Sequence, residues 1–349
     1  MTTRAALVGR AVLRGAAACL LLPCWTSVAA QTGSAPMTVA APEARAAERG
    51  VNEWLARMQE ASRRRAYVGT FVVTAGANLS SARIWHVCDG VQQVERVESL
   101  TGAPRSTFRH NDQVLTFLPD ARLVVAEKRE SLALFPNFLQ AGEASIARFY
   151  QLKAAGTGRV AGLEADILQL QPKDNLRFGY QVWSEKSTGL VVKLQTLDGA
   201  GQVLEQAAFS ELRLDAPVSM TELTRMMGRT EGYQLARPEL VKAVAAVEGW
   251  VLKTDVPGFK PQSCQKRAMA ASGAARQAPT LQWIFSDGLA SVSLFIELFD
   301  PRRHGQSASY AMGATHTLTR RIGDWWLTAV GEVPPQALLA FAQGLERNR

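Results

Sequence analysis

The sequence is poor in the residues that most catalytic and metal sites require. It has four cysteines and four histidines, and it contains neither a Gly-x-Ser-x-Gly elbow nor a phosphate-binding glycine loop. His86 and Cys88 lie at H-x-C spacing, but two ligands fall short of the three or four that zinc takes in proteins. Ser286-Asp287-Gly288 has no histidine placed beside it and is better interpreted as a tight turn between strands. These absences argue against an enzyme, and we expect no catalytic residue, metal or cofactor.

Long apolar runs are absent except for one short stretch near the N-terminus. Three arginines within the first 14 residues precede an uncharged, mostly apolar stretch at 16–28, which ends in the small residues Val28-Ala29-Ala30. This order is typical of a cleaved secretory signal, whereas a membrane anchor needs about 20 apolar residues. We therefore predict a signal peptide at 1–30, followed by a flexible lead-in at 31–49 that is rich in alanine and proline.

Clusters of basic residues are missing as well. The formal net charge is +8, and three of the arginines that contribute to it belong to the predicted signal peptide. No Lys/Arg cluster alternates with aromatic residues in the way that nucleic-acid-binding proteins show. We expect no nucleic-acid partner, and the mild positive charge suits an acidic peptide or an anionic lipid head group without requiring either.

Two cysteines, Cys88 and Cys264, remain after removal of the signal peptide. An oxidising exported compartment permits a disulfide between them, which would pin together what we interpret as two domains. Their spacing does not decide between this bridge and two free thiols, so both alternatives stay open.

The pattern of apolar residues predicts two domains of α+β class, because the chain is longer than one hydrophobic core comfortably serves. A helix over 50–62 is followed by short β-branched segments with Gly, Asn and Asp turns between them, which is typical of an antiparallel meander. Such a long sheet twists and curls, so we expect a partly closed barrel with an apolar interior. The first domain is placed at 50–215.

Prolines and glycines interrupt the chain after this point, and we predict a connecting segment at 216–249 and a second, smaller domain at 250–349. Residues 260–279 are polar and rich in alanine, and we expect them to be mobile. The other elements expected here are helices at 220–227, 239–247 and 335–345 and strands at 281–285, 290–300, 309–319 and 325–330.

Aromatic residues are the candidates for a ligand cavity in the first domain. A curled sheet with one helix need not fill its own interior, so some of these rings would line a cavity for an acyl chain; the alternative is an ordinary core. Asp174, Arg177 and Arg159 would then lie at the rim and meet a charged head group. The cavity candidates are Phe71, Trp85, Phe117, Phe135, Phe138, Tyr180 and Trp183.

Several stretches, taken in order, resemble one protein family. They include Tyr67-Val-Gly-Thr-Phe-Val-Val73, Arg83-Ile-Trp-His86, Pro172-Lys-Asp-Asn-Leu-Arg-Phe-Gly-Tyr180, Phe285-Ser-Asp-Gly-Leu-Ala-Ser-Val-Ser293 and Gly331-Glu-Val-Pro-Pro335. No single stretch is specific, but the ordered set is similar to the RseB/MucB family of periplasmic sigma-E regulatory proteins over about residues 50–345.

The resemblance implies a periplasmic protein whose first domain is an unclosed antiparallel barrel with helices, like the lipoprotein carriers of the LolA type. It also implies binding to the periplasmic part of a membrane-spanning anti-sigma factor, which is thereby shielded from site-1 proteolysis until lipid or lipopolysaccharide releases it. A lipid or lipoprotein carrier is the alternative function, and self-association is left open. The partner-binding candidates are Phe285, Ser286, Asp287, Gly288, Leu289, Gly331, Glu332 and Val333.

Overall fold

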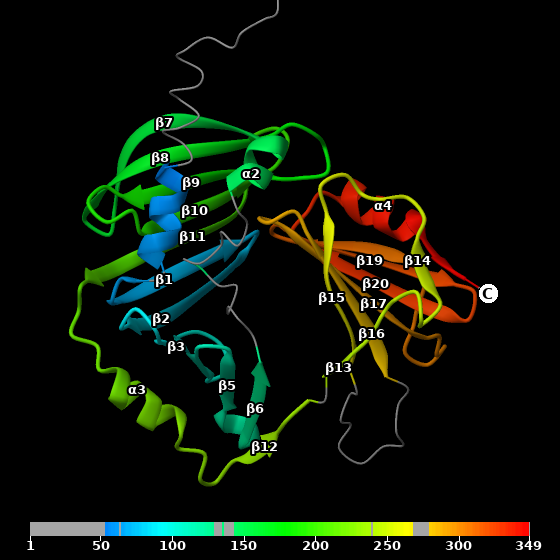
Figure 1. Ribbon diagram of the computed structural model, residues 1–349, viewed down its shortest axis with the longest axis horizontal. Helices are drawn as coiled ribbons and strands as arrows, with labels where there is room; N and C mark the ends of the chain where they lie inside the picture. Colours follow the sequence, from blue (N-terminus) through cyan, green and yellow to red (C-terminus); the bar gives the residue numbers. More distant parts are fainter. Residues whose placement is uncertain are drawn as a thin grey trace, which may run out of the picture.

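The chain folds into two β-sheets that lie beside each other (Figure 1). The computed structural model describes residues 53–62, 64–128, 135, 143–238, 240–267 and 279–348, with residues 143–145 described in backbone only. Each sheet has a hydrophobic core of its own, which confirms the predicted two-domain organisation. Within the described ranges, no helix is both long enough and apolar enough to cross a membrane.

The N-terminal sheet has twelve strands in the order β12-β6-β5-β4-β3-β2-β1-β11-β10-β9-β8-β7. Neighbours are antiparallel, except that β12 joins β6 in parallel. The order of the described strands begins at β12 and ends at β7, so the sheet is unclosed, as predicted. The strands are β1 (Tyr67–Ala75), β2 (Asn78–Cys88), β3 (Gln93–Ser99), β4 (Ser106–His110), β5 (Gln113–Leu118), β6 (Leu123–Lys128), β7 (Tyr150–Val160), β8 (Leu163–Pro172), β9 (Gly179–Glu185), β10 (Val191–Leu197), β11 (Val203–Leu214) and β12 (Gln234–Ala236).

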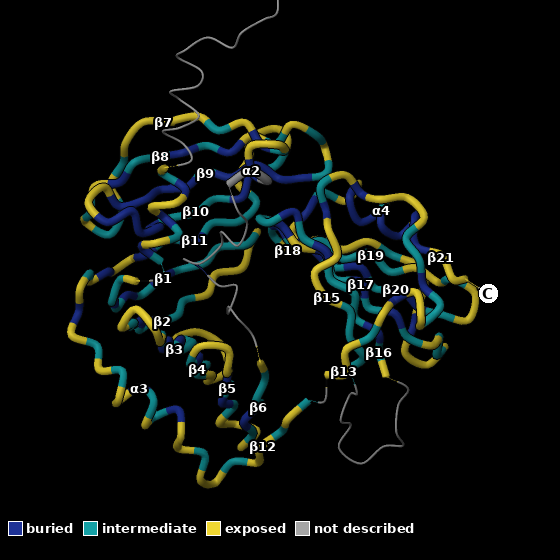
Figure 2. The backbone as a smooth tube through the Cα atoms, viewed as in Figure 1, coloured by how far each residue is buried: buried dark blue, intermediate teal, exposed yellow. Residues whose placement is uncertain are grey.

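Strand alternation sends one set of side chains to the inner face of this sheet. On β1 the alternate residues Tyr67 and Phe71 are buried, and between them Gly69 leaves space for the ring of Phe209. A Cβ at Gly69 would lie 2.6 Å from that ring, so the sheet packs closely here because this position has no side chain. The edge strand β7 is largely exposed, in contrast to the buried β9 (Figure 2).

The helical residues 53–62 lie against the inner face of the half made by β8–β11 (Figure 1). The guanidinium of Arg57 donates hydrogen bonds to the carbonyl oxygens of Lys186, at 2.5 Å, and of Ser187, at 2.6 Å. This anchors the helix to the turn between β9 and β10. The apolar side chains that it buries are Leu55, Met58 and Ala61.

A second, smaller core covers the outer face of the other half. Helix α3 (Met220–Met227) begins at Ser219, whose hydroxyl accepts the backbone N–H of Glu222 as an N-cap. Met227 of α3 packs there on Phe108 and on neighbouring apolar side chains. The predicted helix at these residues is confirmed, and it belongs to the first domain rather than to a free connection.

The C-terminal sheet has seven strands in the order β13-β15-β16-β17-β20-β19-β18. Helix α4 (Pro335–Gly344) closes its core with the fully buried Leu338 and Phe341. The strands are β13 (Leu240–Lys242), β15 (Lys260–Arg267), β16 (Thr280–Ser286), β17 (Ser291–Leu298), β18 (Ala308–Met312), β19 (Thr315–Ile322) and β20 (Trp325–Gly331), with a separate pair of β14 (Trp250–Leu252) and β21 (Leu345–Arg347). The remaining short helices in the part of the chain that the structure describes are η1 (Pro119–Ala121) and α2 (Glu143–Phe149).

Three predictions for the connecting segment and the second domain are wrong. Residues 240–247 do not form the helix predicted at 239–247, because β13 and the N–H of Ala243 pair with the β15 backbone instead; residue 239 lies outside the described residues. The polar residues 260–267 form β15, while 268–278 lie outside the described residues. The strand predicted at 309–319 is two strands joined at Gly313, whose φ of +59° turns the chain.

Candidate functional site

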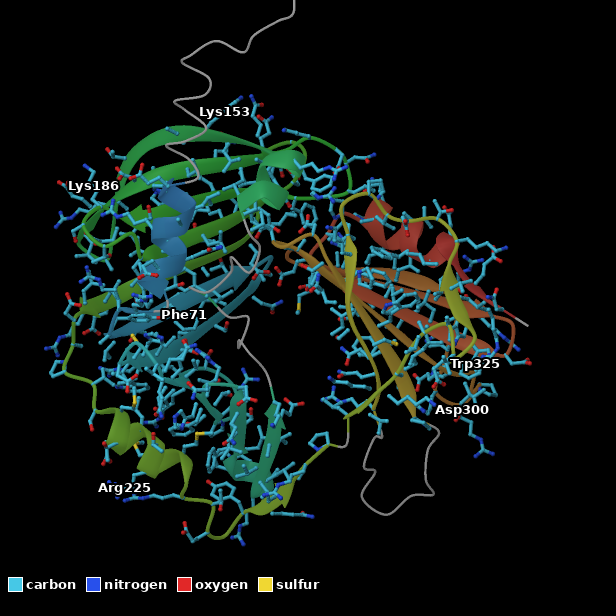
Figure 3. The ribbon with its side chains drawn as sticks, in the orientation of Figure 1. Phe71, Lys153, Lys186, Arg225, Asp300 and Trp325 are labelled. Carbon is cyan, nitrogen blue, oxygen red and sulfur yellow. The ribbon has the colours of Figure 1, made fainter. Side chains whose placement is uncertain are left out.

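An aromatic cluster fills the inner face of the N-terminal sheet. The rings of Phe71 and Phe135 have centroids 5.6 Å apart, and Phe135 lies 5.0 Å from Phe209. Tyr180 belongs to the same core, and Phe71 is labelled in Figure 3. Trp183 packs next to this core, but it lies three residues after Tyr180 on β9 and points to the opposite face, where Lys193 Nζ is 4.3 Å from its ring centroid. Three of the seven predicted cavity candidates, Phe71, Phe135 and Tyr180, are thus brought together in one apolar interior, in which the Phe135 ring is packed against the sheet.

Two other cavity candidates lie elsewhere, which corrects the prediction for them. Trp85 alternates with the inward-facing Ile84 and lies on the outer face, where the guanidinium of Arg96 is 4.7 Å from its ring. Phe117 packs in the small core on the same outer face, 5.4 Å from Tyr233. Both were grouped with the others by composition alone, although strand alternation separates them. Phe138 lies outside the described residues.

A buried polar row crosses the inner face of β2, β3 and β4 in register. His86 faces Glu95, and Glu95 faces Arg109. The Arg109 Nε lies 2.7 Å from Glu95 Oε2, and His86 Nδ1 donates to the Arg65 carbonyl oxygen at 2.7 Å. All three side chains of the row are at most 3% exposed. The sequence analysis missed this row, which alternation combined with the hairpin register would have shown.

The two domains meet at a second buried ion pair. Arg177 precedes β9, and its Nε lies 2.7 Å from Oδ2 of Asp287, which sits in the turn between β16 and β17. Both side chains are fully buried. The same guanidinium donates to Asp174 and to the carbonyl oxygen of Pro257. Arg177 therefore does not lie at a solvent-facing rim as expected, because its charge is used to join the domains.

Aromatic rings and one hydroxyl complete this junction. The Arg177 guanidinium lies 4.2 Å from the centroid of Phe149 and 4.9 Å from that of Phe259. Tyr150 donates its hydroxyl to Asp287 at 3.4 Å. Burial, together with the nearby Tyr180 and Asp287, raises the pKa of the Tyr150 hydroxyl well above its usual value. The hydroxyl therefore stays protonated at physiological pH and donates a hydrogen bond to the Asp287 carboxylate.

The predicted partner-binding residues are mostly buried in or beside this junction. Phe285, Gly331 and Val333 lie in the C-terminal domain, with Phe285 and Val333 in its core. Leu289 packs against the core of the N-terminal domain. The Ser286 hydroxyl accepts the N–H of Gly288 and donates to the carbonyl of Ala290, which shapes the turn. Of the eight candidates, seven are buried or half-buried and Glu332 is exposed.

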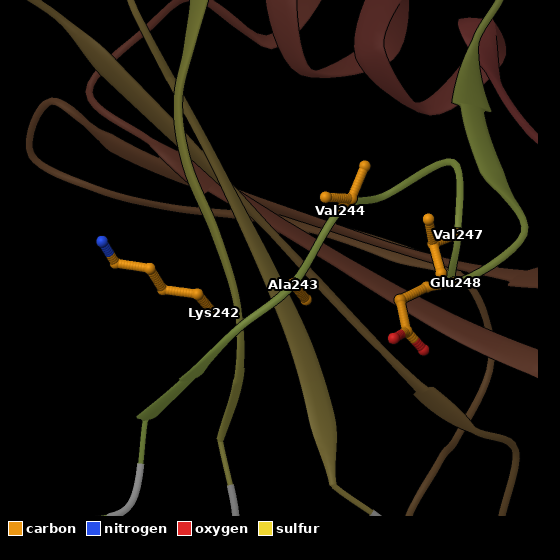
Figure 4. A pocket seen from close by; sticks show the side chains of 5 residues that line it. All are labelled: Lys242, Ala243, Val244, Val247 and Glu248. Atoms are coloured by element: carbon orange, nitrogen blue, oxygen red, sulfur yellow. The ribbon is translucent and has the colours of Figure 1, made fainter.

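Exposed apolar side chains occur instead around β13. Val241 is 58% exposed, Val244 61% and Val247 82%. A shallow pocket of about 300 Å³ opens here, lined by Val244, Val247, Ala243, Lys242 and Glu248 (Figure 4). The sequence analysis passed over this surface because it placed a helix at these residues. Contiguous exposed apolar side chains of this kind commonly mark a surface that contacts another molecule.

The two cysteines are unpaired: Cys88 lies in β2 and Cys264 in β15, in different sheets. Partial burial raises the pKa of both thiols. Across the described ranges, no group of three or more potential ligands could hold a metal ion. The arrangement therefore offers an apolar interior, a charged junction and an exposed apolar strip, all of which suit binding.

Comparisons with known proteins cover both domains. The model of the MucB/RseB N-terminal domain matches residues 50–227, and that of the MucB/RseB C-terminal domain matches residues 244–346. The sigma factor AlgU regulatory protein MucB of Pseudomonas aeruginosa is 28% identical over 302 residues, which cover 85% of this chain and 90% of that protein. The sigma-E factor regulatory protein RseB of Escherichia coli K12 is 21% identical over 84% of this chain and 89% of its own length.

A solved structure of the Pseudomonas aeruginosa MucA/MucB complex is similar as well. It has a TM-score of 0.67 and 25% identity, and the match covers 86% of this chain and 99% of that chain. A crystal structure of MucB with MucA(peri) gives a TM-score of 0.64 and 26% identity, with 85% and 98% covered. The similarity thus extends through both domains and the segment between them.

Proposed function

Because the chain belongs to the MucB/RseB family, we propose that it is a periplasmic negative regulator of an envelope-stress sigma factor of the sigma-E type. It binds the periplasmic part of a membrane-spanning anti-sigma factor and shields that segment from site-1 proteolysis, so the sigma factor stays sequestered. The observation that carries this proposal is the match over both domains to MucB solved with MucA. The curated relatives are regulatory proteins, and MucB has been solved in complex with MucA, so this chain is proposed to act by binding.

The partner segment is proposed to engage the C-terminal domain and its boundary with the first domain. Among the residues predicted for this contact, Glu332 is accessible on the loop between β20 and α4, and desolvation of its carboxyl, together with the nearby Glu205, raises its pKa. Asp287 and Leu289 are used within the chain, so they influence the partner through the placement of the domains. The exposed valines after β13 supply an apolar surface on the same domain.

Lipid or lipopolysaccharide is proposed to release the partner. The aromatic interior of the N-terminal sheet supplies an apolar environment in which an acyl chain would compete with the Phe135 ring for its packing partners. Two ligands that favour different arrangements of one protein oppose each other. A coupling of about 1–3 kcal/mol changes affinity about 5–150-fold, enough for a switch.

Calorimetry tests this function directly. The mature protein is titrated with the soluble periplasmic segment of the anti-sigma factor from the same genome, with and without purified lipopolysaccharide. Binding that lipopolysaccharide weakens supports the proposal. Absence of binding at micromolar concentration refutes it, whereas binding that lipopolysaccharide leaves unchanged removes the release step.

A lipid or lipoprotein carrier is the alternative, favoured by the open sheet and its apolar interior. A carrier would bind lipid and show no affinity for the anti-sigma segment. It would also leave the C-terminal domain without a task, although that domain has a well-packed core of its own.

A further inference from the structure

Arg177 contacts both domains at once, so all of its contacts are made only when the two domains are arranged as in this structure. Its guanidinium donates to Asp287 and to the Pro257 carbonyl of the C-terminal domain, and to Asp174 of its own. Both charges of the Arg177–Asp287 pair are fully buried, so a rotation that separates them leaves the Asp287 carboxylate without its cationic partner, while Arg177 keeps Asp174. We therefore expect the junction to be held or released as a unit.

The backbone at Gly258 makes this fit close. Its φ is +85°, and a Cβ there would lie 2.1 Å from Nη2 of Arg177 and 2.7 Å from the Phe149 ring. The guanidinium thus packs against bare backbone while it lies between the rings of Phe149 and Phe259. Closely packed contacts of this kind change between discrete arrangements rather than deform continuously.

Tyr150 joins the junction to the interior of the N-terminal domain. It is 2% exposed, belongs to the core of that domain, and donates its hydroxyl to Asp287. The preceding residue, Phe149, ends α2 and lies on the Arg177 guanidinium, and Ile146 of α2 is in the same core. A ligand that enters this core and displaces α2 or the start of β7 therefore disturbs the contacts of both junction charges.

From this geometry we infer that Arg177 is the positioning residue that sets the domain arrangement required for partner binding. Tyr150 transmits the effect of a ligand in the N-terminal interior to that domain arrangement. The inference rests on the proposed function for its partner, but its structural part concerns the domains alone. An acyl chain in the interior and a peptide on the protein then act against each other through this junction.

The experiment uses the two native thiols of the mature chain as reporters. Cys88 and Cys264 lie one in each domain, are unpaired and are partly exposed, so spin labels on them report the interdomain distance by pulsed EPR. The Arg177→Met variant is expected to broaden the distance distribution and to weaken binding of the anti-sigma segment at least about 10-fold. The matched control is Arg267→Met, which removes a partly exposed interdomain pair with Glu127 and should change affinity by no more than about fourfold.

A second variant tests the link between the N-terminal interior and the domain junction without disturbing the packing of the core. Tyr150→Phe keeps the ring in the core and removes the hydroxyl that reaches Asp287. We expect it to fold, to keep the wild-type distance, and to lose affinity less steeply when purified lipopolysaccharide is added. An unchanged response to lipopolysaccharide overturns the role of Tyr150. Should Arg177→Met fail to fold, as judged by circular dichroism, the isosteric Asp287→Asn takes its place in both measurements.

A wild-type distance distribution in Arg177→Met overturns the positioning role whatever the affinity. A broadened distribution with wild-type affinity overturns it too, because the arrangement would then not matter for binding. Failure of the unmodified chain to bind the segment refutes the proposed function instead, and the distance measurement still decides whether Arg177 sets the arrangement.

Discussion

Among the described residues, two ion pairs of equal N–O distance but different burial join the domains. Arg177–Asp287 and Arg267–Glu127 both have an N–O distance of 2.7 Å. The first pair is fully buried, whereas the side chains of the second are 33% and 10% exposed. In the buried pair Asp287 depends on Arg177 for its counter-charge, because water cannot replace a missing partner, whereas Arg177 is also paired with Asp174. In the second pair water can replace a missing partner in part. Burial rather than distance therefore decides which pair determines the domain arrangement.

The largest effect is expected from removing one side of the buried pair. Asp287→Ala leaves the enclosed Arg177 guanidinium with Asp174 as its carboxylate partner and removes the acceptor of the Tyr150 hydroxyl, so it should lower the free energy of unfolding by about 3 kcal/mol, the lower end of the range for a broken buried pair. Urea denaturation followed by circular dichroism measures this. A loss below about 1 kcal/mol, the usual value for an exposed pair, would mean that water reaches the junction.

A methyl group at Gly258 should come next. Gly258→Ala meets the Arg177 guanidinium and also strains a backbone with φ of +85°. The matched control is Gly76→Ala, whose φ is +59° and whose Cβ would meet nothing within 4 Å. We expect the control to lose about 1–2 kcal/mol from strain alone and Gly258→Ala to lose clearly more. Equal losses in denaturation would show that the junction is loose at this point.

The partly exposed pair should respond least among the ion pairs. Glu127→Gln is expected to lower the free energy of unfolding by about 0–1 kcal/mol, and added salt should shrink the difference further because exposed charges are screened. Denaturation of the variant and the unmodified chain at low and high salt tests this. A loss as large as that of Asp287→Ala would abolish the distinction between the two pairs.

A third contact between the domains provides the smallest effect, which depends on pH. Burial raises the pKa of Glu205, although the N–H of Ala314 in the other domain donates to it and lowers the pKa in part. A carboxyl whose pKa rises on folding favours the folded state in its protonated form, so its deprotonation weakens folding as pH increases through that pKa. Glu205→Gln should therefore be slightly more stable than the unmodified chain at neutral pH, and the difference should vanish below the ordinary carboxyl pKa of 4.5. A Glu205→Gln variant that is more stable than the unmodified chain at low pH but not at neutral pH would contradict this prediction.

Much of the architecture could be predicted because local patterns report it. Strand alternation and turn residues gave the open sheet, and apolar periodicity gave α3 and α4. The helix predicted at 239–247 failed because β13 pairs with β15 and the residues after β13 form a turn, which leaves Val241, Val244 and Val247 facing water. Apolar periodicity predicts which residues would share one face of a helix, but it does not show whether another element covers that face.

The junction could not be predicted for a different reason. Arg177 and Asp287 are 110 residues apart in the chain, and no local pattern brings them together. Trp85 and Phe117 were misplaced for another reason: strand alternation assigns them to the outer face, but they were chosen by counting aromatic residues, which ignores the two faces of a sheet. The row of His86, Glu95 and Arg109 falls between these cases, since the hairpin register alone places it.

Protection of the partner from proteolysis tests the central claim most directly. The periplasmic segment of the anti-sigma factor is incubated with the site-1 protease, with and without the mature protein, and its cleavage is followed over time. The account predicts that an equimolar amount of the protein slows cleavage strongly and that purified lipopolysaccharide restores it. Cleavage at the same rate with and without the protein would contradict the account.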